Sequence, residues 1–142
     1  MTTERWNPQP GEPVVVFANN VHASGTSTDE VTFAKVDRVT KTLVVLDNGQ
    51  RYEMRDVTGD GYLRQRADRT CSMCAICVYP ATHPNVPGRL NRARRERAIS
   101  SARALARNLP GDLADGDPAK VIRAAAARLT ELANIIEGTD QQ

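Results

Sequence analysis

Asn48 and Gly49 separate two short runs of strand-forming residues, and they constrain the fold more than any other feature of the sequence. The runs at 43–47 and 50–54 are rich in β-branched, aromatic and long apolar side chains. Asn and Gly tolerate a positive φ, which a type I′ turn requires at both of its central residues. The sequence therefore predicts a β-hairpin with a two-residue turn.

This turn also predicts which residues face each other. Counting outward from it pairs Leu46 with Arg51 and Val45 with Tyr52. Side chains alternate between the two faces of a strand, so one face is expected to join the core and the other to be partly solvated. The expected core face holds Leu43, Val45, Tyr52 and Met54. The expected solvated face holds Val44, Leu46, Arg51 and Glu53.

The chain before this hairpin also has the pattern of short strands. A proline-rich lead-in over 1–12 precedes a β-branched run at 14–18. A polar loop is expected over 19–29. A second strand is expected at 31–39, bent or bulged where its apolar positions change parity. The first half of the chain is therefore predicted to be all β.

Short strands of this kind, with Tyr62 and Leu63 as a further one, favour a small antiparallel barrel over 13–66 that closes its own edges. The segments 13–16 and 34–52 resemble SH3-like barrels of the KOW and Tudor types. More narrowly, they resemble small uncharacterised proteins of actinobacterial phages in which such a barrel precedes a helical tail. The resemblance is structural. It implies a binding module and a phage origin, and it assigns no functional residue.

A helix is predicted over 89–109, ended by Pro110 and Gly111 because proline cannot continue a helix without loss of a hydrogen bond. Its apolar side chains fall within about 120° of the helical wheel. Most of its arginines lie on the opposite side. The apolar residues are Ala98, Ile99, Ala102, Leu105, Ala106 and Leu109.

A second helix is marked by Asp117 as N-cap, Pro118 in its first turn and Gly138 as its stop. Its apolar stripe is Val121, Ala125, Leu129, Leu132 and Ile136. A loop of about eight residues would join the two helices into an antiparallel hairpin. The predicted fold class is α+β: a small antiparallel SH3-like barrel followed by a C-terminal two-helix hairpin. The expected boundaries are 1–12 for the lead-in, 13–66 for the barrel, 67–88 for an uncharged cysteine-containing connector, 89–138 for the hairpin and 139–142 for a tail.

The composition favours a cytoplasmic protein. Hydrophobic residues make up 40% and charged residues 25% of 142 residues. No stretch approaches the roughly 20 apolar residues of a membrane span. The N-terminal residues lack the apolar run of a secretory signal. An odd count of three cysteines argues against a disulfide scaffold.

The positive charge is concentrated in the first predicted helix. Segment 89–109 holds seven arginines and one glutamate, although the net charge of the whole chain is only +2. Arginine makes bidentate contacts to phosphate, so such a face could follow a nucleic-acid backbone. The alternative is that these arginines pair with the chain's own carboxylates. The residues predicted to contact nucleic acid are Arg89, Arg92, Arg97, Arg103 and Arg107.

Three cysteines and a histidine suggest a zinc site, which competes with a purely structural interpretation. Thiolates and imidazole are zinc ligands, but structural sites usually separate two ligand pairs by a dozen residues or more. Reduced cysteines also behave as small buried apolar residues, which makes a packed connector the favoured interpretation. No cofactor is therefore predicted. The candidate ligands are Cys71, Cys74, Cys77 and His83.

The sequence predicts a binding protein and not an enzyme. His22 and His83 lie in separate polar segments, and no nucleophile or phosphate-loop motif accompanies them. The leading hypothesis is a non-enzymatic protein that contacts nucleic-acid phosphates through the arginine-rich helix. The alternative is a module that binds a host or phage protein or self-associates through the hairpin. A third hypothesis is a site for a phosphorylated small molecule between barrel and helices.

Overall fold

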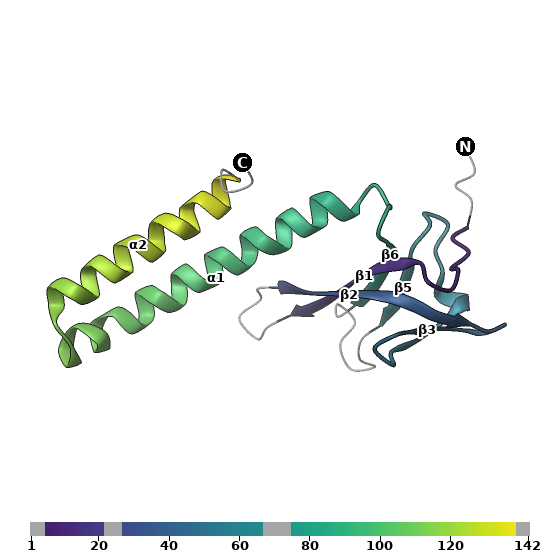
Figure 1. Cartoon of the computed structure of the whole chain (residues 1–142), viewed down its shortest axis with the longest axis horizontal. Coiled ribbons are helices and arrows are strands. Elements are labelled where there is room, and N and C mark those ends of the chain that lie inside the picture. Colours follow the sequence, from purple (N-terminus) through teal and green to yellow (C-terminus); the bar gives the residue numbers. More distant parts are fainter. Residues whose placement is uncertain (1–4, 22–26, 67–74, 139–142) are drawn as a thin grey trace. The chain divides into compact units, whose positions relative to one another are not determined.

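The computed structural model describes residues 5–21, 27–66 and 75–138 and has a β-sheet unit followed by two helices (Figure 1). The chain divides into two compact units, 1–90 and 91–142. The elements are β1 (Pro13–Val21), β2 (Ser27–Val39), β3 (Leu43–Leu46), β4 (Arg51–Glu53), the 3₁₀ turn η1 (Met54–Asp56), β5 (Leu63–Arg66), β6 (Ala75–Pro80), α1 (Val86–Asp115) and α2 (Pro118–Glu137).

The first unit is a nearly closed antiparallel barrel. Its strands follow the order β4-β3-β2-β1-β6-β5. β4 and β5 are the two edge strands of this order. An isolated bridge joins Val57, which follows β4 and η1, to Leu63 of β5, and so nearly closes the barrel. The predicted fold class, a small antiparallel barrel followed by two helices, is therefore confirmed. The interior is filled by Trp6, Val14, Val16, Ala34, Val36, Val44, Leu46, Tyr52, Val57, Leu63 and Val78.

The prediction of a polar loop over 19–29 is wrong at both of its ends, where the structure has strands. β1 continues to Val21 and β2 already begins at Ser27, with Asn19 opposite Asp29 in the ladder. Cross-strand hydrogen bonding overrides the low strand propensity of Asn, Asp and Ser here. The bend expected in the second strand is present as a register shift between Val36 and Arg38.

The predicted hairpin exists, but its register differs by one residue. Val44 pairs with Tyr52 and Val45 with Arg51, so the loop has three residues and not two. Within this loop only Gly49 has a positive φ, of 86°, whereas a type I′ turn also needs one at the preceding Asn. A one-residue shift moves every side chain of one strand to the other face. Val44 and Leu46 therefore enter the barrel interior, contrary to the expected faces.

The segment expected to be a connector contains the sixth strand. β6 lies between β1 and β5 in the sheet. Val78 points into the barrel, while Cys77 and Tyr79 are buried on the outer face. A strand buried on both faces has a continuous apolar run with no alternation, which a packed connector would also show. The barrel therefore extends well beyond residue 66.

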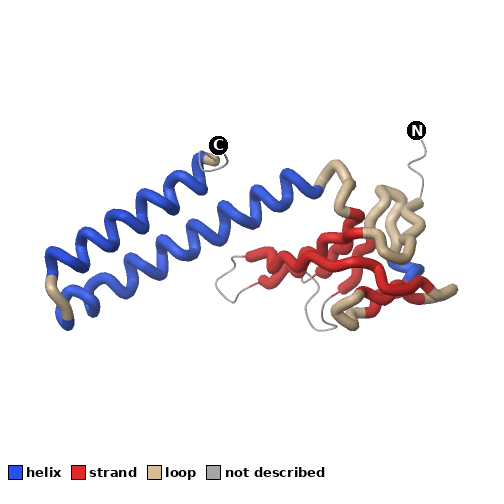
Figure 2. The backbone as a smooth tube through the Cα atoms, in the orientation of Figure 1, coloured by secondary structure: helices blue, strands red, loops and turns tan. Residues whose placement is uncertain are grey.

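Both helices are present, and the first is longer than expected. α1 begins at Val86 and continues through Pro110 to Asp115. Only Gly116 and Asp117 separate it from α2, so the helices run antiparallel as a hairpin (Figure 2). Within the described residues, neither helix is long and apolar enough to cross a membrane.

The predicted caps of α2 are confirmed. The side chain of Asp117 accepts a hydrogen bond from the backbone N–H of Ala119 at 3.1 Å. Gly138 ends the helix with a φ of 76°. Ala125 and Leu132 are buried on the predicted apolar stripe, whereas Leu129 is 44% exposed.

Candidate nucleic-acid interface

The five arginines predicted to contact nucleic acid fall into three environments. Arg89 belongs to the barrel unit, and Arg92 and the remaining three belong to the hairpin unit. Arg92 donates a hydrogen bond to Glu96 one turn further along α1, at 2.9 Å, and this pair is exposed. Exposed pairs of this kind contribute little to stability, so the Arg92 guanidinium can exchange partners. The three others, all exposed and without an ion pair to any described residue, are Arg97, Arg103 and Arg107.

Arg89 is held within the barrel unit, which corrects its place in the predicted interface. Its Nε donates to a carboxylate oxygen of Asp29 at 3.2 Å, and an Nη donates to the hydroxyl of Tyr79 at 3.2 Å. Its guanidinium carbon lies 4.7 Å from the centroid of the Phe17 ring. Only 23% of the Arg89 side chain is exposed. The sequence does not indicate this contact, because Asp29 lies sixty residues away in a segment predicted to be a loop.

The electrostatics of Arg89 agree with a structural role. Burial by itself would lower the pKa of Arg89, but hydrogen bonds to Asp29 and Cys77 outweigh it and raise the pKa above its ordinary value. Burial also raises the pKa of Tyr79, with hydrogen bonding and charge from Arg89 acting in the opposite direction. Arg89 is therefore a permanently charged anchor between the start of α1 and β2.

Aromatic rings surround this anchor on the outer face of the barrel. Tyr62 and Tyr79 are stacked with ring centroids 4.5 Å apart, and the His83 ring meets Tyr79 edge to face with centroids 4.9 Å apart. Phe17 contacts Tyr79 edge to face at 5.7 Å. Val86 and Leu90, from the first turn of α1, pack on the same cluster. The cluster fixes the first turn of α1 on the outer surface of β1 and β6.

The zinc hypothesis gains no support from the residues that the structure describes. These residues contain no group of three potential ligands suited to a metal ion. Cys71 and Cys74 lie outside the described residues, and Cys77 is buried among the aromatic rings. In His83, Nδ1 accepts from the backbone N–H of Asn85, so Nε2 carries the proton and donates to the Asp60 carbonyl at 2.8 Å. Both ring nitrogens of His83 are thus engaged in hydrogen bonds and are not available to a metal ion in this structure.

The exposed arginines of the hairpin share one side of α1. At 100° per residue, Arg92, Arg97, Arg103 and Arg107 fall within an arc of about 140°. The rise of about 1.5 Å per residue places Arg97 and Arg107 roughly 15 Å apart along the axis. Ala98, on the opposite side of the wheel, is buried. Ala93 is also buried and falls within the arginine arc, but from Arg97 onward the arginines face away from the buried and half-buried side chains of α1.

Two further arginines, Arg94 and Arg95, flank the apolar side of the predicted helix near its start and are not part of the predicted interface. Arg95 is exposed and makes no ion pair or hydrogen bond to a described residue. Its neighbour Arg94 is half-buried and has a partner. Arg95 therefore presents a further positive charge to solvent. Glu96 is the only acidic residue between 89 and 109, so this charge is little compensated nearby.

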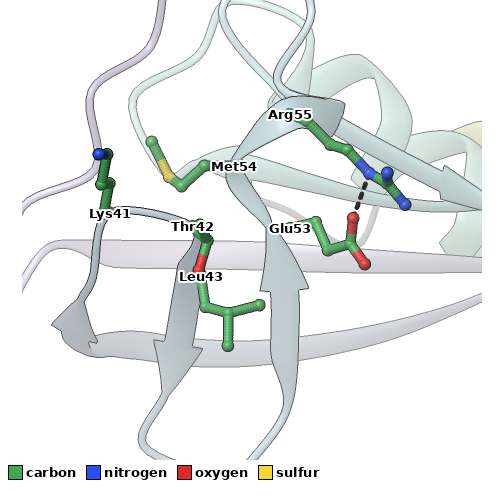
Figure 3. Close-up of a pocket in the computed structure, with 6 residues that line it drawn as sticks. All are labelled: Lys41, Thr42, Leu43, Glu53, Met54 and Arg55. Carbon is green, nitrogen blue, oxygen red and sulfur yellow. Dashed lines mark ion pairs between the residues drawn. The ribbon is translucent and has the colours of Figure 1, made fainter.

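The barrel unit carries a separate surface pocket of about 440 Å³ at one end of β3 and β4. Leu43 and Met54 give it an apolar floor, and Lys41 lies on the opposite side from the ion pair between Glu53 and Arg55 (Figure 3). With Arg55 engaged by Glu53, Lys41 is the one lining cation without an ion pair. This charge balance is weak for a phosphorylated ligand, which usually meets several donors.

Comparisons with known proteins give no match to a protein-family model, to a curated protein or to a solved structure. The resemblance to proteins of actinobacterial phages stays a prediction. A functional assignment for this chain therefore depends on the chemistry of its own surfaces.

Proposed function

We propose that the protein is a non-enzymatic binding protein that contacts the phosphates of double-stranded nucleic acid through the exposed arginines of α1. The observation that supports this proposal is the set of free guanidinium groups at Arg97, Arg103 and Arg107. The contact residues proposed are these three and Arg92. Arg89 is excluded because its donors are engaged by Asp29 and Tyr79.

The distribution of charge along the hairpin indicates which part of it would bind a polyanion. The stretch from residue 91 to 108 carries six arginines and one glutamate. Asp112, Asp115 and Asp117 follow within three turns and would repel phosphates at the loop end of the hairpin. The proposed interface is therefore confined to the first two thirds of α1.

The binding mode follows from the residue types. Arginine forks donate to phosphate oxygens, and such contacts position a protein on a duplex without reading its sequence. No aromatic residue lies between the arginines of α1, which disfavours stacking on unpaired bases. Binding should be electrostatic, weakly dependent on sequence and steeply dependent on salt.

The test is a fluorescence-anisotropy titration of labelled duplexes at rising salt, with DNA and RNA of the same sequence. The variant Arg103→Gln/Arg107→Gln removes two proposed phosphate contacts. Each contact contributes roughly 0.9 to the slope of log affinity against log salt, so the slope should fall by about two units. The affinity at fixed salt should fall roughly tenfold or more.

The matched control is Lys120→Gln/Arg123→Gln, which removes the same charge from exposed positions of α2. We expect this control to leave the slope nearly unchanged. If both double variants lowered the salt slope and the affinity equally, only the net charge would matter, and the α1 interface would be rejected. Absence of binding by the native chain at low salt would reject the function itself.

A second candidate function, a protein-interaction module, is favoured by a different observation. Ile122 is 54% and Leu129 44% exposed, and their spacing of seven residues places them on one side of α2. A hairpin of two helices buries only one stripe of each, so this apolar surface remains open within the hairpin unit. Substitution of both residues by Ser should abolish such an interaction and leave the salt slope of the duplex titration unchanged.

A further inference from the structure

α2 carries a second apolar stripe beside the one that packs within the hairpin. Four exposed apolar residues recur along it at spacings of four, three and four, within an arc of about 60° at 100° per residue. The middle of this arc lies roughly 80° from the buried residues Ala125 and Leu132. Alternating spacings of three and four are those of a coiled-coil seam. This seam consists of Ile122, Ala126, Leu129 and Ala133.

The seam alternates large and small side chains in an order that matches its own reverse. A second α2 that runs antiparallel, with a twofold axis midway between Ala126 and Leu129, sets Ala126 of one copy against Leu129 of the other. The same axis sets Ile122 against Ala133. Each layer then holds one large and one small side chain, which fills the space evenly. A parallel pair would set alanine against alanine in alternate layers and leave voids there. The side-chain sizes therefore favour an antiparallel copy of the same helix.

We propose that the protein forms a dimer in which the seam of α2 packs antiparallel against the seam of a second copy. The proposal rests on the second candidate function, the protein-interaction module, and identifies the protein partner as this chain itself. It does not depend on the nucleic-acid function. The pairing covers Ile122 and Leu129, the large apolar residues that α2 exposes in the hairpin.

Two charged residues that flank the seam support a second copy as the partner. Arg123 and Glu137 are exposed, and neither makes an ion pair or hydrogen bond to a described residue. In the antiparallel register, Arg123 lies about 7.5 Å along the axis from Glu137 of the second copy. Each side chain leans towards the other, because helical side chains tilt towards the N-terminus of their own helix. The twofold axis repeats this attraction, so the dimer gains two such pairs, and flanking pairs of this kind set the partner and the orientation of coiled coils.

The remaining charges of the hairpin oppose this pairing only weakly. Lys120, Arg128 and Glu131 lie at least about 130° from the middle of the seam. On α1, Arg95 and Arg103 fall on the side of the hairpin that carries the seam and face the same helix of the second copy. Both are exposed, and at about 0.15 M salt repulsion between exposed charges is largely screened beyond about 8 Å. The dimer is therefore expected at physiological salt.

The first test is sedimentation velocity of the full chain at about 0.15 M salt over a wide range of concentration. We expect a dimer for the native chain and a monomer for Ala126→Glu, because the new carboxylate would be buried between the two seams. The matched control Ala127→Glu adds the same charge at the next residue, which is also exposed but lies roughly 130° from the seam. This control should remain dimeric. A native monomer at all concentrations, or a dimer that survives Ala126→Glu, would overturn the proposal.

A second test exchanges the flanking charges, which are exposed and so leave the folded hairpin intact. Arg123→Glu sets glutamate against glutamate at both ends of the dimer and should raise the dissociation constant roughly tenfold. Glu137→Arg should have the same effect with arginine against arginine. These two variants change the net charge in opposite directions, so a common loss cannot come from net charge. The double variant Arg123→Glu/Glu137→Arg restores both attractions and should return the dissociation constant to within about threefold of the native value.

The outcomes separate this proposal from the functions discussed above. A double variant as weak as the two single variants would overturn the antiparallel register and the proposal with it. A native monomer with an unchanged salt slope in the duplex titration would overturn the dimer and leave the nucleic-acid function standing. In that case the interaction module would need a different protein as its partner, whose binding Ile122→Ser/Leu129→Ser should still abolish.

Discussion

At the scale of single residues, identical side chains on one helix have different roles because their surroundings differ. Arg89 is mostly buried against Phe17 and bonded to Asp29, whereas Arg103, four turns later, is exposed and has no ion pair to a described residue. Removing one partner of a partly buried pair leaves a charge without compensation. The structure therefore predicts that Arg89 acts on stability and Arg103 on phosphate binding.

Substitution of Arg89 tests its structural role. We expect Arg89→Met to lower the free energy of unfolding of the barrel unit by about 2 kcal/mol, because it removes charged hydrogen bonds but keeps an apolar stem on Phe17. Arg89→Lys should recover only part of this loss, since a lysine cannot reproduce the planar fork. Urea denaturation measures both.

The partner variant Asp29→Asn completes a double-mutant cycle with Arg89→Met. Contacting charged residues should give a coupling free energy of about 1 kcal/mol or more. An additive cycle would show that the ion pair contributes nothing. A change in the salt slope of duplex binding by Arg89→Met, with stability unaffected, would return Arg89 to the nucleic-acid interface.

At the scale of elements, the β3–β4 turn decides which face of its hairpin enters the core. Leu46 accepts a hydrogen bond from Gly49 through its carbonyl and donates its N–H to Gln50. The side chain of Asn48 accepts from the backbone N–H of Gln50 at 3.0 Å while its own φ stays negative. Only one residue of the turn therefore needs the left-handed conformation.

Alanine substitutions of two glycines test this turn. Gly49 has a φ of 86° and open space around its Cα, so the cost of Gly49→Ala is purely conformational and should be about 1 kcal/mol. The matched control is Gly59→Ala, also in open space but without a positive φ. We expect the control to be neutral or to stabilise by a few tenths of a kcal/mol. If thermal or urea denaturation showed an equal loss of stability for Gly49→Ala and Gly59→Ala, the assigned turn geometry would be contradicted.

At the scale of the whole molecule, the chain divides its tasks between two compact units. The barrel unit holds two apolar clusters, one inside the barrel and one on its outer face. The hairpin unit carries the concentrated arginines and the exposed apolar side of α2. Stability is thus expected to depend mainly on the barrel, and salt-dependent binding on the hairpin.

The alkaline stability of the barrel can be predicted from a buried tyrosine. Burial raises the pKa of Tyr52 above its ordinary value of 10.0, while its hydroxyl donates to the Gln50 side chain at 3.0 Å. A raised pKa in the folded state means that unfolding releases a proton, so this contribution to stability is complete below pH 10 and is lost as the pH rises above it.

Tyr52→Phe removes the titrating group, so the free energy of unfolding should fall less steeply above pH 10 than it does for the native chain. At neutral pH the variant should differ from the native chain only by the small contribution of one hydrogen bond. Urea denaturation at a series of pH values gives both quantities. A variant as sensitive as the native chain above pH 10 would assign the alkaline loss to other groups.

The sequence by itself determined the features that depend on local chemistry. Asp117, Pro118 and Gly138 mark both ends of α2, because capping needs only neighbouring residues. The hairpin near Gly49 and the fold class also follow from local pattern. The arginine concentration on α1 is visible in the printed sequence.

Only the tertiary structure decided the features that depend on residues far apart in the chain. The register of β3 depends on its pairing with β2, and the identity of β6 depends on its place between β1 and β5. The role of Arg89 depends on Asp29, which the folded sheet brings within hydrogen-bond distance. Pairing and burial are long-range properties, so a pattern of neighbouring residues cannot specify which arginines remain free.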